Sequence, residues 1–133
     1  MKILGIEHIG IAVDDIKNDS KFWKDIIKIN HLSTEDIKSQ GAKTDIYDTG
    51  KGKVELLQAY GSNSPISKFL RNRGPGVHHI CFEVENIKDA IKELKKNKVK
   101  LVSEEASIGA EGYKIIFIHP QSTGGVLVEL AEK

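Results

Sequence analysis

Two histidines and two glutamates recur at matched places in the chain, and their side chains offer nitrogen and oxygen donors for a divalent metal ion. His8 begins the stretch HIGIAV and His79 begins HICFEV, an offset of 71 residues (79 − 8). Glu55 and Glu129 each stand between a valine and a leucine, 74 residues apart (129 − 55). The two offsets differ by only a few residues, which a small difference in loop length explains. The sequence therefore predicts a duplicated unit.

Strand alternation places these side chains on the less bulky face of each predicted strand. Gly10 and Ala12 share the face of His8, whereas the isoleucines and the valine between and after them point the other way. Glu55 and Glu129 likewise point away from the valine and leucine that flank them. If the bulky side chains pack on a helix, the histidines and glutamates face whatever concave surface the sheet makes.

Two modules related by a pseudo-two-fold axis would bring two imidazoles and two carboxylates to one ion. Such a set without thiolate suits Zn²⁺, Ni²⁺, Co²⁺, Mn²⁺ or Fe²⁺ and does not select among them. Water or substrate would occupy the remaining positions, so the ion could act as a Lewis acid on a carbonyl oxygen and stabilise an enolate. A single histidine or glutamate in a strand usually has no special role, but four at matched positions favour a metal site.

The remaining histidines and the only cysteine are weaker candidates. Alternation sends His78 to the face opposite His79, which favours a structural role for His78. His31 follows a predicted helix and His119 lies at a strand end, and neither is expected to act directly. Cys81 shares the face of His79, where it either lines the cavity or is a small buried thiol.

The elements that position these residues follow the order βαβββ twice, which predicts an α+β fold with two tandem modules forming a curved mixed sheet around the metal site. We expect a single domain over 1–133, built of a module at 1–61, a linker at 62–76 and a module at 77–133. Asp14 or Asp15 is placed to cap the first helix, and Asn86 begins the second. The strands that can be delimited are 8–13, 44–48 and 54–59, then 79–84, 99–104, 113–119 and 125–131.

The composition excludes several other classes of protein. The net charge of +1 disfavours a nucleic-acid partner, which would require a strongly basic face. No segment reaches the roughly 20 apolar residues that span a bilayer, so we expect no membrane partner. The chain has one cysteine and begins without an export signal. These features predict a cytoplasmic protein.

Several longer stretches resemble the methylmalonyl-CoA epimerase family of the vicinal oxygen chelate superfamily, which also includes glyoxalase I. The His and Glu pairs are shared across that superfamily, whereas other stretches are more specific to the epimerases. The likeness covers nearly the whole chain. The stretches are His8-Ile-Gly-Ile-Ala-Val, Val54-Glu-Leu-Leu, Ser64-Pro-Ile-Ser-Lys-Phe-Leu, Gly76-Val-His-His-Ile-Cys-Phe-Glu-Val, Ile108-Gly-Ala-Glu-Gly, Ile118-His-Pro and Gly124-Gly-Val-Leu-Val-Glu-Leu.

This resemblance implies an activity and a set of partners. The implied enzyme is a racemase/epimerase that interconverts the C2 epimers of methylmalonyl-CoA through a metal-stabilised enolate. It implies an acyl-CoA substrate, a homodimer, and one divalent ion, Co²⁺ foremost with Zn²⁺, Ni²⁺ or Mn²⁺ as alternatives. The ion would be held by His8, Glu55, His79 and Glu129. Glu129 would also be a catalytic base.

The resemblance leaves the second acid–base group open. Some family members carry a further glutamate three residues after a Gln-Gly pair, but here Gln40-Gly41 leads to Thr44. Asp45 comes next and is expected on the other face. The second group therefore comes from elsewhere, through a water molecule for instance, or Asp45 moves into the role.

Two alternatives compete with the epimerase. A glyoxalase I (lactoylglutathione lyase) would use the same four ligands and similar enolate chemistry, but the Ser-Pro-Ile and His-His-Ile-Cys stretches favour the epimerase. A metal-free module of the same fold that binds a small molecule would not need the four ligands. Their presence argues against that alternative.

Overall fold

The computed structural model describes residues 1–133, and the chain forms two compact units. The central unit comprises His8–His78, and the terminal unit comprises Met1–Glu7 together with His79–Lys133. The chain therefore passes from one unit to the other at the Glu7–His8 and His78–His79 peptide bonds. The boundaries of the units differ from those of the predicted modules, because the first seven residues belong with the second half of the chain.

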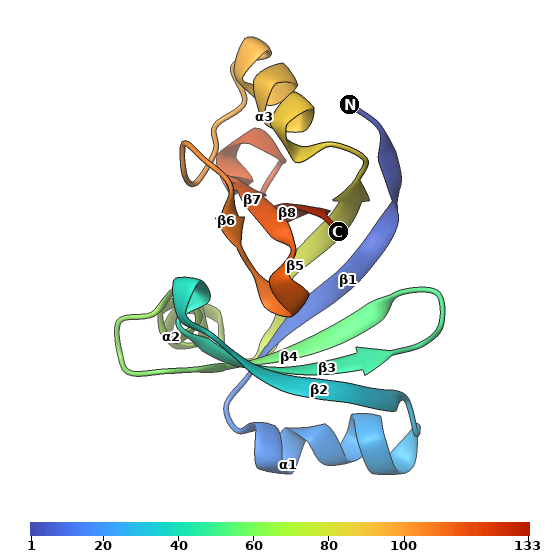
Figure 1. The fold of residues 1–133 in the computed structure, drawn as a ribbon. Helices are drawn as coiled ribbons and strands as arrows, with labels where there is room; N and C mark the ends of the chain where they lie inside the picture. The colour runs from blue at the N-terminus through green and yellow to red at the C-terminus, as the bar shows by residue number, and fades with distance from the viewer. The chain divides into compact units, whose positions relative to one another are not determined.

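The central unit is a four-stranded sheet with a helical segment on each face (Figure 1). Its strands lie in the order β2-β3-β4-β1, with β1 parallel to β4 and the other pairs antiparallel. The elements are β1 (Ile3–Val13, of which the part from His8 belongs here), α1 (Ile16–Lys21), η1 (Phe22–Ile26), β2 (Asn30–Ile37), η2 (Lys38–Gln40), β3 (Ala42–Asp48), β4 (Lys53–Ala59) and α2 (Pro65–Arg73).

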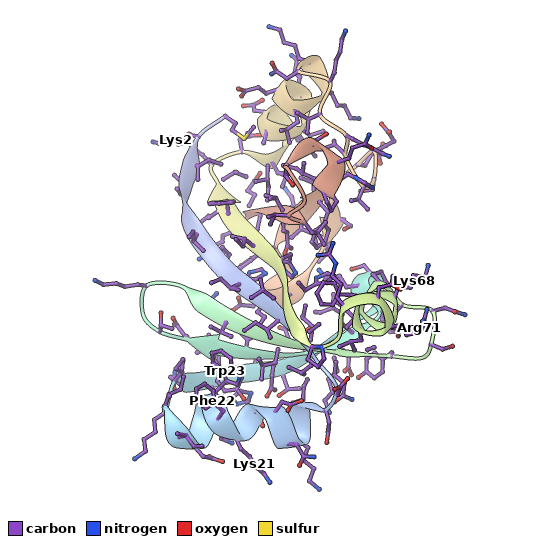
Figure 2. The ribbon with its side chains drawn as sticks, turned by 180° about the vertical axis from the view of Figure 1, so that it is seen from behind. Lys2, Lys21, Phe22, Trp23, Lys68 and Arg71 are labelled. Atoms are coloured by element: carbon purple, nitrogen blue, oxygen red, sulfur yellow. The ribbon has the colours of Figure 1, made fainter.

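Asp15, one of the two residues predicted to cap the first helix, caps α1. Its side chain accepts a hydrogen bond from the backbone N–H of Lys17. The helix continues into the π-helical turn η1, and Trp23 of this turn packs with Ile16 and Leu56 on one face of the sheet. Figure 2 shows Trp23 between this helical segment and the strands. The bulky side chains of β1 and β4 therefore lie on the helix side, which leaves the opposite face for His8 and Glu55.

The terminal unit places the first part of β1 next to β5 in the strand order β1-β5-β8-β7-β6. β5 and β8 are parallel, whereas β8 with β7 and β7 with β6 are antiparallel. The elements are β5 (Gly76–Val84, here from His79), α3 (Ile87–Lys96), β6 (Ser107–Ile108), η3 (Ala110–Gly112), β7 (Lys114–Ile118), η4 (Pro120–Ser122) and β8 (Val128–Glu132).

α3 is the second of the two helices that the sequence predicts, and it is amphipathic. Asn86 caps it by accepting a hydrogen bond from the backbone N–H of Asp89. Ile87 and Leu94 are buried against Leu130 and other apolar side chains of the sheet. This packing occupies one face of β5 and β8 and leaves the other face for His79 and Glu129.

The strand predicted at 99–104 is wrong. Only Leu101 pairs with a neighbour, through an isolated bridge to Ile118, and the first of the three strands after α3 is β6, a few residues later. Val99 and Leu101 instead pack against the core beside α3. The chain then turns, and the Ser103 hydroxyl donates to the carbonyl of Glu105. These apolar residues are therefore held in place by core packing and not by strand pairing.

The first module also has three strands after its helix, and the sequence predicts one of these without bounds. It is β2, whose residues 30–36 alternate between exposed and half-buried positions before the buried Ile37. None of the helices in either unit has the length and apolar character needed to cross a bilayer.

Candidate metal centre

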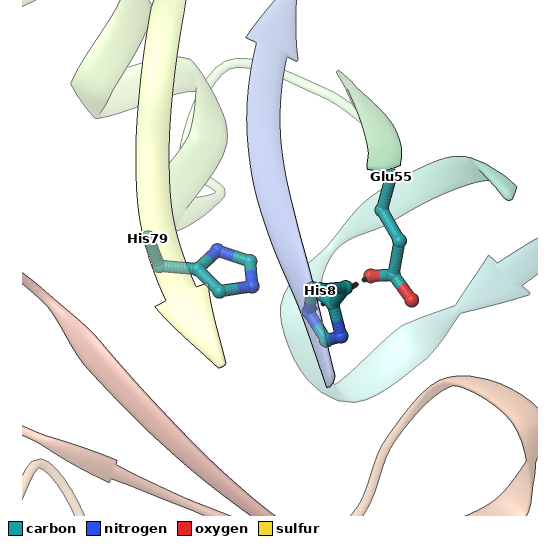
Figure 3. A group of neighbouring side chains, drawn as sticks. All are labelled: His8, Glu55 and His79. Atoms are coloured by element: carbon teal, nitrogen blue, oxygen red, sulfur yellow. Dashed lines mark ion pairs between the residues drawn. The ribbon is translucent and has the colours of Figure 1, made fainter. Parts of the chain in front are cut away.

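In the central unit, His8 and Glu55 form a buried pair. The Nε2 atom of His8 lies 3.2 Å from Oε2 of Glu55, and these residues are 5% and 3% exposed. Figure 3 shows this ion pair, with His8 on β1 and Glu55 on β4, and also draws His79 on β5. The pairing of β1 with β4 places Gly10 beside Glu55, and His8 is two residues before Gly10. Alternation therefore puts the imidazole and the carboxylate on the same face.

In the terminal unit, His79 and Glu129 form the matching pair. Nε2 of His79 lies 2.9 Å from Oε2 of Glu129, and the residues are 1% and 2% exposed. The pairing of β5 with β8 places Cys81 beside Glu129, and His79 is two residues before Cys81. The ring of Phe117 meets the His79 ring edge-on, with centroids 5.5 Å apart.

The two pairs are built in the same way. In each unit a histidine lies two residues before the residue that faces the glutamate on a parallel neighbouring strand. The duplication found in the sequence is thus reproduced in the strand register. Burying an imidazole with a carboxylate is costly unless each group has a partner, and a metal ion is one partner that would recover this cost. The residues present fit a divalent ion, since both donor types are common ligands of such ions.

Cys81 has no exposed surface, and its sulfur lies within 4.8 Å of a carboxylate oxygen of Glu129. It packs with Ile115 and Ala131 on the face of the terminal unit that carries His79. Its position agrees with the face predicted from alternation, and its environment is that of a small buried thiol.

The other three histidines have partners of their own. The ring of His78 packs edge-on against Phe69, with centroids 4.9 Å apart. Nδ1 of His119 accepts a hydrogen bond from the backbone N–H of Gln121 at the start of η4. His31 lies in β2, with Nε2 3.2 Å from a carboxylate oxygen of Asp45.

Thr44 and Asp45 occupy opposite faces of β3, as alternation predicts. Ile46 pairs with Glu55 across the strands, so Thr44, two residues earlier, shares the face of the glutamate. The Thr44 hydroxyl is buried without a hydrogen-bond partner. Asp45 points to the α1 side and is held there by other side chains, so the structure does not place it on the face of His8.

The environment of Asp45 keeps its carboxylate ionised. Burial raises the pKa of Asp45, but hydrogen bonds from Thr34, Tyr47 and His31 outweigh that effect, and the pKa lies below its usual value. Burial and the neighbouring Asp45 carboxylate raise the pKa of Tyr47, so its hydroxyl remains a hydrogen-bond donor. Nothing in the separate motifs of the sequence points to this cluster.

The class of protein follows from the fold, the paired sites and a family match. Residues 7–117 match the family described as the glyoxalase/bleomycin resistance protein/dioxygenase superfamily. The eight strands, arranged as two βαβββ modules, have the vicinal oxygen chelate fold of that superfamily.

Several similar proteins have more specific names. Mouse mitochondrial methylmalonyl-CoA epimerase is 40% identical over 132 residues, covering 98% of this chain and 74% of the relative. A crystal structure of methylmalonyl-CoA epimerase from Mycobacterium tuberculosis has a TM-score of 0.94 at 31% identity, covering 98% and 88% of the two chains. A Streptomyces coelicolor methylmalonyl-CoA epimerase variant, in complex with 2-nitronate-propionyl-CoA, has a TM-score of 0.94 at 28% identity, covering 99% and 96%. The chain belongs to the methylmalonyl-CoA epimerase family.

Proposed function

We propose that this protein is a metal-dependent epimerase that interconverts the C2 epimers of methylmalonyl-CoA. The observation that carries the proposal is the identical register of the two buried His–Glu pairs, His8 with Glu55 and His79 with Glu129. Family membership supplies the substrate, since relatives bear the name of this activity and one is described in complex with an acyl-CoA compound.

The proposed metal centre uses both pairs for one ion. His8 and His79 are the residues at which the chain passes between the two units, so each is one peptide bond away from the other unit's chain. This connectivity supports a shared ion over two separate ones. When bound, a divalent ion would stabilise negative charge on the thioester and carboxylate oxygens of the substrate. We propose Co²⁺ as the ion.

The proposed reaction removes the C2 proton, which is acidic because it lies between a thioester and a carboxylate, and returns a proton to the opposite face. Glu129 would carry the proton on one side, in addition to binding the ion. The Thr44 hydroxyl is not deprotonated at neutral pH, so it cannot accept the C2 proton in place of a carboxylate. Its buried hydroxyl, on the face of Glu55, would instead hold a water molecule that serves the other side.

Two further features belong to the proposal. A homodimer is supported by apolar side chains that β1 leaves exposed, among them Ile3, Leu4 and Ile6. A cytoplasmic location is supported by the absence of any possible intrachain disulfide, because Cys81 is the single cysteine and is a free thiol.

Loss of the C2 proton signal of methylmalonyl-CoA in D₂O, followed by NMR, tests substrate and metal together. We expect rapid exchange with metal-loaded protein, loss of exchange after chelation, and recovery when Co²⁺ is added. No exchange with metal-loaded protein would contradict the epimerase and make glyoxalase I the next activity to assay. Exchange that persists after complete metal removal would contradict the role of the ion but not the substrate.

A further inference from the structure

A cavity lies in the central unit, on the opposite face of the sheet from His8 and Glu55. It has a volume of about 420 Å³ and lies between the α1–η1 segment and strands β2, β3 and β4. This volume is within the usual range for small-molecule sites, about 300–1,000 Å³. Ile16 is the only aliphatic side chain that lines it, so the cavity suits a polar ligand.

The floor of the cavity is a closed hydrogen-bond network centred on Asp45. The Thr34 hydroxyl donates to one oxygen of Asp45 at 2.5 Å, and the Tyr47 hydroxyl donates to the other at 2.8 Å. His31 Nε2 lies 3.2 Å from the first oxygen. The other carboxylate of the cavity, Asp15, accepts the backbone N–H that caps α1. Both negative groups are therefore engaged by the protein itself.

The positive groups of the cavity are not engaged in this way. Lys17, Lys24 and Lys43 line it, and none of their ammonium groups forms an ion pair or hydrogen bond. Lys24 belongs to the π-helical turn η1, and π-helical turns are frequent at functional sites. The two carboxylates keep their charge, so the three lysines leave the lining with a formal net charge of +1 (3 − 2), and this positive balance attracts anions.

We propose that this cavity binds a small phosphate-bearing anion. Ammonium groups bind phosphate oxygens as point charges, and three of them suit the two or more charges of a phosphate better than a single carboxylate. The closed network under Asp45 keeps that carboxylate away from the ligand by holding it against the floor. Because the cavity and Glu55 lie on opposite faces of the sheet, this site is separate from the proposed metal centre.

Calorimetric titration of the full chain with pyrophosphate tests the proposal. We expect saturable binding that weakens as salt is raised, and a loss of about 10-fold in affinity in the double variant Lys24→Gln/Lys43→Gln. Lys21→Gln is the matched control, because Figure 2 shows Lys21 on the side of α1 away from the strands and it does not line the cavity. We expect this control to bind within about twofold of the unchanged protein.

Comparison of ligands separates the possible sources of the phosphate. Pyrophosphate and adenosine 3′,5′-bisphosphate test a free phosphate and a nucleotide phosphate, and malonate tests a carboxylate of similar charge. Backbone NMR shifts should move around Lys24 and Lys43 with either phosphate compound. No saturable binding, an equal loss in Lys21→Gln, preference for malonate, or shifts only around Lys68 and Arg71 of α2 would overturn the proposal (Figure 2).

Discussion

At the scale of single residues, Glu129 is the side chain whose chemistry is most demanding. It is 2% exposed and lies 2.9 Å from His79, so its carboxylate is held in one place by buried surroundings. In the proposed reaction the same carboxylate binds the ion and carries a proton. A neutral amide of the same size would retain an oxygen donor but could not carry that proton.

We therefore expect Glu129→Gln to reduce C2 proton exchange by about 100-fold or more, since general acid–base groups contribute 10²–10⁴-fold. Metal content should be measured in the same sample. Glu105→Gln, at an exposed position of the same unit, is the control and should exchange at the unchanged rate. Full exchange in a metal-loaded Glu129→Gln variant would show that the proton is carried by another group.

Asp45 allows a prediction about stability and pH. Because its folded-state pKa lies below the usual 3.8, its contribution to stability is fully present above about pH 4 and is lost as pH falls through the lower folded-state value. Asp45→Asn should lower the free energy of unfolding at pH 7 by about 1–3 kcal/mol, because the hydrogen bonds from Thr34 and Tyr47 lose their charged acceptor. Urea unfolding at pH 7 and pH 3 measures this. A difference between variant and unchanged protein that does not shrink at pH 3 would contradict the role of the charge.

At the scale of elements, the turn that leads into β3 depends on Gly41. Its φ of +59° lies in the left-handed region, and a Cβ added there would lie 2.6 Å from the Cβ of Ser64, the residue that caps α2. The tight approach links the start of β3 to the start of α2. A side chain at this position would strain the backbone and displace the helix.

We expect Gly41→Ala to lower the free energy of unfolding by about 2–4 kcal/mol, with backbone strain and overpacking each contributing. Gly50→Ala is the matched control, because Gly50 has a φ of +88° but nothing within 4 Å of an added Cβ. The control should lose about 1 kcal/mol from strain alone. Equal losses measured by urea unfolding would show that the contact with Ser64 is unimportant.

At the scale of the whole molecule, one ion bound by residues from both units would couple their stabilities. Saturating Co²⁺ should raise the free energy of unfolding by about 2.7 kcal/mol at 100 times the dissociation constant. His8→Ala and His79→Ala should each abolish most of this gain, although they alter different units. Thermal unfolding with and without Co²⁺ measures the effect. If His8→Ala retained the full gain, the ion would not be shared.

Much of the architecture was predictable from local patterns. The strand alternation around His8 and His79 and the helix starts at Asp15 and Asn86 depend on residues close together in the chain. The four metal-ligand residues could also be predicted, because a sequence repeat identifies equivalent positions in the two modules before any distance is known. The strand predicted at 99–104 was wrong, because an apolar run packs equally well against a helix when no continuous strand partner is available.

The sequence by itself determined the duplicated βαβββ order, the faces of the strands and the types of donor atom, since each of these follows from periodicity and residue chemistry. Only the tertiary structure decided the cluster of His31, Thr34, Asp45 and Tyr47 and the lysine-lined cavity above it. It also decided which backbone segments pair, including β2 and β6. The physical reason is that hydrogen bonds, cavities and strand partners join residues distant in the chain, and local patterns do not encode which of them meet.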